Sequence, residues 1–127
     1  MKASLAFRLT AIAVFIQIAL GGLVTFEFVP PEIHMIVGFA VLAMAIVSAY
    51  LALTRRPAFR PIRGLSIGLV TLVIAQILLG FTTLATGNDI IAWIHLLIAM
   101  GIYGMAVSGT FMATRWDNMP QPAMAFK

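Results

Sequence analysis

Two histidines, His34 and His95, are the residues of this sequence with the clearest capacity for chemistry. Each lies near the start of a long apolar stretch, where an ionisable side chain is costly and therefore usually functional. Imidazole is a common ligand of transition metals, and two imidazoles can fill both axial positions of a porphyrin iron. Because the chain has no cysteine, thiolate metal sites, iron–sulfur clusters, disulfides and cysteine nucleophiles are excluded. The pair is therefore a candidate bis-histidine site for the iron of a porphyrin.

The surroundings of the two histidines are similar. Each histidine is preceded by a glutamine and a glycine, which are Gln17 and Gly21 before His34, and Gln76 and Gly80 before His95. The glutamine precedes the histidine by 17 positions in the first copy and by 19 in the second. Self-similarity of this kind predicts an internal duplication. We expect one domain over residues 1–127, with repeat 1 at about 5–56 and repeat 2 at about 63–116.

The glycines and glutamines could serve either of two roles, contact with a bound macrocycle or packing of the membrane helices. Gly21 and Gly80 lie at a depth similar to that of the histidines and can admit a flat macrocycle close to the backbone. Gln17 and Gln76 lie one turn deeper and can hydrogen-bond across the core or to the ring edge. Small residues and glutamines also serve simply to pack and join membrane helices. Thr25 and Thr83 are further candidates, as donors to the heme propionates.

The elements that must position these residues are four apolar stretches. Hydrophobic residues make up 62% of the 127 residues and charged residues only 9%, which excludes a water-soluble globular domain. The stretches cover about residues 5–28, 33–53, 65–85 and 90–114. Each is long enough to cross a hydrocarbon layer of about 30 Å as a helix. The sequence predicts an all-α membrane protein with four transmembrane helices in an up-down-up-down bundle, built from a duplicated helical hairpin.

The connections and charges predict the topology. Pro30-Pro31 separates the first two helices, Gly87 forms a turn, Asp89 is the expected N-cap of the fourth helix, and the tail from Asp117 onward is expected to be frayed. All eight basic residues fall on one side, and they are Lys2, Arg8, Arg55, Arg56, Arg60, Arg63, Arg115 and Lys127. The positive-inside rule then predicts a multi-pass plasma-membrane protein with both termini cytoplasmic and the histidines toward the outer side. This one-sided charge indicates lipid contact and excludes a nucleic-acid footprint.

A Gln-x-x-x-Gly segment, a short outer connection and an early histidine in the next helix, given twice, resemble the heme A synthase family. Members are usually eight-helix proteins of two similar halves, and the resemblance covers most of residues 10–115 as one such half. It implies that His34 and His95 are the axial ligands of one heme b. It also implies oxidation of a heme methyl group, which requires a glutamate three residues before a ligand histidine. Pro31 and Ala92 occupy those positions here, and Glu32, two residues before His34, is the candidate catalytic residue.

Three functions stay open at this point. The first is a membrane b-type cytochrome for electron transfer or heme handling, expected to form a homodimer and to meet a redox partner or quinone. The second is a compact heme A synthase that uses Glu32. The third is an assembly factor or transporter subunit without a cofactor. A proton-coupled transporter would need a carboxylate in the middle of a span, and none of the four stretches has one.

Overall fold

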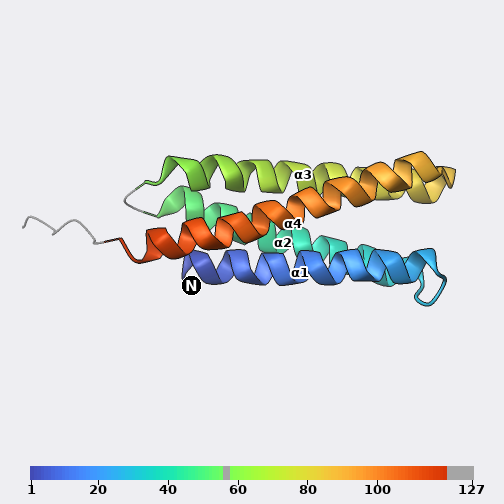
Figure 1. The fold of residues 1–127 in the computed structure, drawn as a ribbon, viewed down its shortest axis with the longest axis horizontal. Helices are drawn as coiled ribbons and strands as arrows, with labels where there is room; N and C mark the ends of the chain where they lie inside the picture. The colour runs from blue at the N-terminus through green and yellow to red at the C-terminus, as the bar shows by residue number, and fades with distance from the viewer. Residues whose placement is uncertain (56–57, 120–127) are drawn as a thin grey trace, which may run out of the picture.

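The computed structural model describes residues 1–55 and 58–119, and its secondary structure there is helical. The helices are α1 (Ala3–Thr25), α2 (Pro31–Thr54), α3 (Arg60–Thr86) and α4 (Asp89–Asp117), shown in Figure 1. Each is long and apolar enough to cross a membrane. The predicted four-helix membrane bundle is confirmed.

The helices pack around a square. α1 and α3 each pack against both α2 and α4, whereas among the described residues the backbones of α1 and α3, and those of α2 and α4, do not approach each other closely. We call the end where α1 and α3 begin and α2 and α4 end the terminal end, and the end with connections 26–30 and 87–88 the hairpin end (Figure 1). The two histidine-bearing helices, α2 and α4, therefore lie on a diagonal, as expected.

α1 ends at Thr25, three residues before the expected boundary, because the chain makes a helix-terminating turn there. The N–H of Phe28 donates to the carbonyl of Leu23 at 2.9 Å, and the N–H of Glu27 donates to Val24 at 3.0 Å. This is the hydrogen-bond pattern of a Schellman motif, whose C′ residue is left-handed and usually glycine. Here that residue is Glu27, with φ of 61°.

Glu27→Gly is expected to stabilise the protein by about 1 kcal/mol, because glycine adopts a positive φ without a Cβ penalty. The measurement is the free energy of unfolding in detergent micelles titrated with dodecyl sulfate. Glu27→Ala is the matched control, since it removes the carboxylate and keeps the Cβ. A stabilisation of equal size in Glu27→Ala would mean that charge, and not backbone conformation, is responsible.

The other helix ends differ from the expectations in detail. Gly87 closes α3 with φ of 62°, as the turn prediction required. The N-cap of α4 is Asn88 and not Asp89: the Asn88 side chain accepts from the N–H groups of Ile90 and Ile91. α3 begins at Arg60 rather than at 65, because Pro61 suits a first helical turn.

Asp117 lies in α4 and is firmly held, so the prediction that the tail frays from this residue is wrong there. Its carboxylate pairs with Arg55 of α2 and accepts the N–H of Ser4 at the start of α1 at 3.0 Å. The Arg55 guanidinium also lies 4.9 Å from the centre of the Trp116 ring. These contacts, which we call the clasp, join three helices at the terminal end because one carboxylate serves two partners. Arg56 and residues 120–127, which include Lys127, lie outside the described residues.

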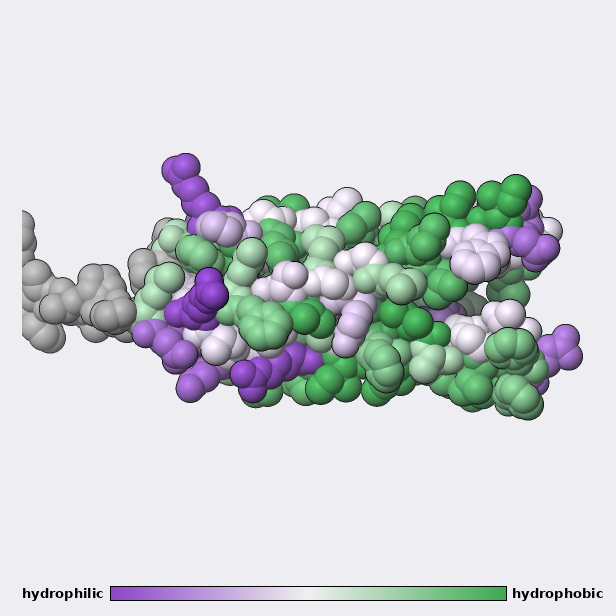
Figure 2. Space-filling model, viewed as in Figure 1, coloured by the Kyte–Doolittle hydropathy of each residue, from purple (hydrophilic) through white to green (hydrophobic). Residues whose placement is uncertain are grey.

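Side-chain burial is confined to one half of the bundle. The largest fully buried side chains near the terminal end are Phe7, Ile62 and Trp116, and Leu69 and Ile102 extend this core toward the middle. Within residues 15–40 and 77–101 no residue is buried. Figure 2 shows an opening at the hairpin end between the α1/α2 pair and the α3/α4 pair. The two hairpins are therefore packed together at the terminal end and separate toward the hairpin end.

Phe7 is the most tightly fitted member of this core. Its side chain is fully buried and comes from the second turn of α1. It lies directly on the backbone of Gly109 in α4, where a Cβ would overlap the ring and would also approach Leu65 to 3.1 Å. The close approach of α1 and α4 at this point depends on the absence of a side chain at Gly109.

Candidate functional site

His34 and His95 lie opposite each other in the open half of the bundle, with the two rings in an edge-on arrangement. Their ring centroids are 6.3 Å apart and the ring planes are inclined by 65°. Both residues are half-buried. Because α2 and α4 are diagonal and their backbones stay apart, these two side chains approach across the bundle axis. The structure therefore brings together the two ionisable side chains that the sequence singled out.

Each histidine ring rests on the glycine of its own hairpin. A Cβ at Gly21 would lie 3.2 Å from Cε1 of His34, and a Cβ at Gly80 would lie 3.2 Å from Cε1 of His95. We expected these glycines to make room for a flat macrocycle. In the structure they make room for the imidazoles, which can then lie close to the neighbouring helix.

Gly21→Val is expected to displace the His34 ring, because even a Cβ at this position is tighter than an ordinary contact. Gly22→Val is the matched control, since nothing lies within 4 Å of a Cβ built there. We expect affinity for hemin to fall about tenfold or more in Gly21→Val and to stay near wild type in Gly22→Val. Equal losses in both variants would show that Gly21 has no special relation to the site.

The two glutamines bind the backbone beside the histidines. Gln17 Nε2 donates to the carbonyl of His34 at 2.8 Å, and Gln76 Nε2 donates to the carbonyl of His95 at 2.5 Å. Gln17 Nε2 also lies 3.2 Å from Nε2 of the His34 ring. Each glutamine thus joins the two helices of one hairpin and fixes the turn that carries the histidine. The joining of helices expected from the sequence describes this arrangement, whereas contact of the glutamines with a bound macrocycle stays a prediction.

Four buried polar atoms at the site have no hydrogen-bond partner. They are Oε1 of Gln17 and Gln76 and Nδ1 of His34 and His95. The set is repeat-symmetric, with one acceptor and one ring nitrogen from each hairpin. Buried polar atoms in proteins are nearly always paired, and an exception points to a bound group or an internal water. The unpaired atoms are concentrated where the duplication places its histidines.

The remaining predicted residues lie at the margin of the site. The Thr25 hydroxyl donates to the carbonyl of Gly21, and the Thr83 hydroxyl donates to that of Leu79, both at 3.0 Å. Glu32 is exposed in the first turn of α2. Within the described part of the chain, no hydrogen bond or ion pair joins Glu32 to either histidine.

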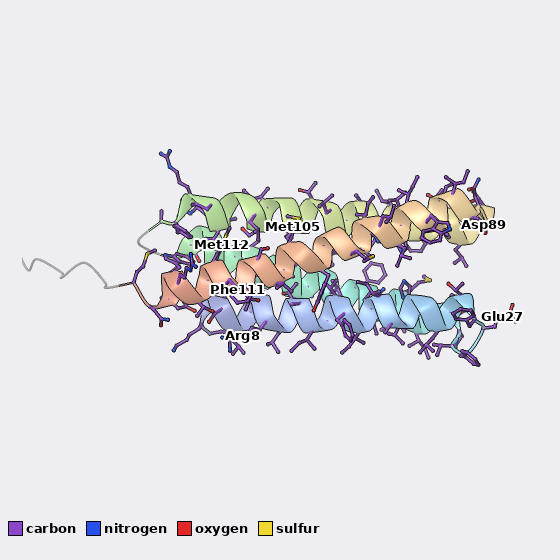
Figure 3. All side chains as sticks on the ribbon, in the orientation of Figure 1. Arg8, Glu27, Asp89, Met105, Phe111 and Met112 are labelled. Atoms are coloured by element: carbon purple, nitrogen blue, oxygen red, sulfur yellow. The ribbon has the colours of Figure 1, made fainter. Side chains whose placement is uncertain are left out.

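Charge is strongly separated along the bundle. Figure 3 shows Arg8 toward the terminal end, and Glu27 and Asp89 at the hairpin end. In residues 1–55 and 58–119, the basic side chains all belong to the terminal half, whereas Glu27, Glu32 and Asp89 belong to the hairpin end. The histidines therefore lie in the half of the molecule that has no basic side chain among the described residues.

Gly38 is a site residue that the sequence analysis missed. A Cβ at this position would lie 3.0 Å from Nε2 of Gln17, so the glycine makes space for the glutamine amide. Its signal in the sequence is its place one turn after His34. The equivalent position after His95 is Ala99, which has a Cβ, so the two halves are not identical here.

Comparison with protein-family models, with curated proteins and with solved structures finds no match for this chain. Its two-histidine site is therefore interpreted from its own residues and contacts.

Proposed function

We propose that this protein is an integral-membrane b-type cytochrome that binds one heme b through His34 and His95, for electron transfer or heme handling. The observation that carries the proposal is the facing pair of imidazoles, with ring centroids 6.3 Å apart. With metal–nitrogen bonds of about 2 Å, two imidazoles on opposite sides of one metal have centroids roughly 6 Å apart. The ring separation in the structure is therefore compatible with one metal held between the two imidazoles.

The composition of the site favours a porphyrin over a bare metal ion. A bare zinc ion takes three or four protein ligands. Within the described residues no group of three or more His, Cys, Asp or Glu side chains comes together. An iron porphyrin supplies four equatorial nitrogens of its own and needs only one or two axial ligands from the protein. Two histidines and no further donor are the set that such a group requires.

The open half of the bundle supplies space and unmet hydrogen-bonding capacity. No residue is buried within 15–40 or 77–101, so the region around the histidines lacks a packed core of its own. The unpaired Nδ1 atoms of both histidines are available as donors or acceptors to a second shell. A large planar apolar group inserted between the hairpins would complete the core there, because it would bury the facing side chains.

The ligand set also defines the class of reaction. A heme held by His34 and His95 would supply one-electron redox chemistry rather than oxygen binding. The chain contributes by holding the imidazoles on Gly21 and Gly80 and by fixing the ligand-bearing turns through Gln17 and Gln76. Apolar walls exclude water and so influence the reduction potential.

The distribution of charge supports an orientation as part of this proposal. With all basic residues of the described chain at the terminal end, we infer that the termini are cytoplasmic in a plasma membrane and that the heme lies toward the outer side. The protein meets anionic lipid headgroups through that basic end. The resemblance to a family of two-halved proteins extends the proposal to a homodimer that passes electrons to a redox partner or quinone.

The test is a titration of the purified protein in detergent with hemin, followed by a reduced-minus-oxidised absorption spectrum. We expect saturation at one heme per chain and a low-spin b-type spectrum. A protein that stays colourless after hemin addition would overturn the proposal. An assembly or transport role would then be the reading to pursue.

A further inference from the structure

The two halves of the site differ in how the glutamine meets the histidine. The amide nitrogen of Gln17 lies 2.8 Å from the carbonyl oxygen of His34 and 3.2 Å from Nε2 of the same residue. A carboxamide nitrogen has two hydrogens and can only donate. One hydrogen therefore goes to the carbonyl and the other to the ring. His34 Nε2 must accept, so its lone pair is engaged and the ring proton is on Nδ1.

His95 has no such contact. Gln76 Nε2 donates to the His95 carbonyl, and no hydrogen bond to His95 Nε2 is present within the described residues. Gly38 lies beside the Gln17 amide, where a Cβ would be 3.0 Å from Nε2. Its counterpart after His95 is Ala99, which has a Cβ. The two halves of the site therefore differ in sequence at the position that adjoins the Gln17 amide.

We propose that Gln17 is a positioning residue that makes His34 the weaker and displaceable axial ligand, and His95 the anchoring one. The inference rests on the proposed function. Nε2 of an imidazole binds a metal through its lone pair, and at His34 this lone pair must first be released by Gln17. At His95 no hydrogen bond from Gln76 engages Nε2 within the described residues, so ligation there would need no such exchange. Gln17 would take up the Nε2 lone pair again whenever His34 left the metal, while His95 would keep hold of the group.

The first measurement compares hemin dissociation constants of the single-histidine variants His34→Ala and His95→Ala. We expect His34→Ala to bind about threefold to tenfold more tightly than His95→Ala, the size of one neutral hydrogen bond converted to an affinity ratio. Adding Gln17→Leu to His95→Ala is expected to remove this difference. Adding Gln76→Leu to His34→Ala is the matched control, because it removes the same kind of carbonyl bond without touching a ring nitrogen, and it should not tighten binding.

The second measurement reads the hydrogen bond itself, in the ligand-free protein. Imidazole ¹⁵N resonances of His34 are expected to show protonated Nδ1 and a hydrogen-bonded Nε2, and this signature should change in Gln17→Leu and persist in Gln76→Leu. A structural role confined to the backbone carbonyl would leave the Nε2 resonance unchanged. Circular dichroism of each variant checks that its helical content is retained.

Each outcome decides the matter. Equal hemin affinities of the two single-histidine variants, or no gain from Gln17→Leu in His95→Ala, would overturn the inference and leave the cytochrome proposal standing. Failure of the wild type to bind hemin would overturn both. If neither single-histidine variant binds measurably, the rate of hemin loss decides in the wild-type background. There Gln17→Leu should lose hemin more slowly than Gln76→Leu, and equal rates would overturn the inference.

Discussion

Replacing either His34 or His95 with alanine is expected to abolish the low-spin, six-coordinate spectrum of the hemin-loaded protein. The two imidazoles face each other across the bundle axis, and the described residues offer no third metal-ligating side chain beside them. Loss of one ligand therefore leaves an axial position empty. We expect hemin affinity to fall by about a hundredfold or more, since even second-shell changes cost tenfold to a hundredfold. Absorption spectra and hemin titration in detergent measure both effects.

Two further variants make this prediction specific. Met35→Ala changes the neighbour of His34 and is expected to leave the spectrum unchanged. His34→Met replaces the imidazole with a thioether, which is a softer ligand. The protein should therefore still bind hemin, with a higher reduction potential. A low-spin spectrum that survives in both His34→Ala and His95→Ala would show that the ligands lie elsewhere.

Gly109→Leu is expected to lower the free energy of unfolding by about 1–3 kcal/mol, the usual cost of overpacking a core. A Cβ at Gly109 overlaps the ring of Phe7, which is fully buried and cannot turn away without leaving the core. α1 and α4 would have to separate at their closest approach. Titration of the micelle-bound protein with dodecyl sulfate, followed by circular dichroism, gives the unfolding free energy.

Gly104→Leu is the control for this prediction. It lies on the same helix, and nothing lies within 4 Å of a Cβ built there. Both substitutions gain helix propensity over glycine by a similar amount, so the comparison isolates the packing term. Equal stability of the two variants would contradict the role given to the Phe7–Gly109 contact.

Much of the fold follows from the sequence because it depends on composition and length. Four apolar stretches with short connections leave an antiparallel bundle as the simplest membrane structure. The diagonal arrangement of α2 and α4 then places their side chains toward a common axis. The two histidines occupy similar places in the two helical hairpins, so the approach of His34 and His95 could be predicted from the sequence.

The parts that the sequence did not reveal depend on local backbone conformation or on close contact between helices. A glutamate in the left-handed region at Glu27 breaks the usual preference for glycine, so α1 was expected to continue to Phe28. Both Asn88 and Asp89 are good N-caps, and only the geometry of the turn distinguishes them. The engagement of Asp117 depends on Arg55 and Ser4, which are distant in sequence and adjacent only in the folded bundle.

The contact of Gly21 with the His34 ring also depends on the close approach of two helices, so it could not be predicted from the sequence. A small residue in a membrane helix can adjoin a ligand, a side chain or another helix, and its type alone does not tell which. The double engagement of His34 by Gln17 depends on Gly38, which has no equivalent glycine in the second repeat. Departures from exact repetition were therefore the least predictable part of the site.

The clasp at Asp117 has a mechanical consequence for the histidines. Asp117 and His95 are 22 residues apart on one helix, which is roughly 33 Å at 1.5 Å per residue. A helix fixed at one end acts as a lever, so a pivot of only a few degrees at the clasp moves the imidazole by about 2 Å. It follows that the place of the His95 ring depends on how firmly Asp117 is held at the far end of the same helix.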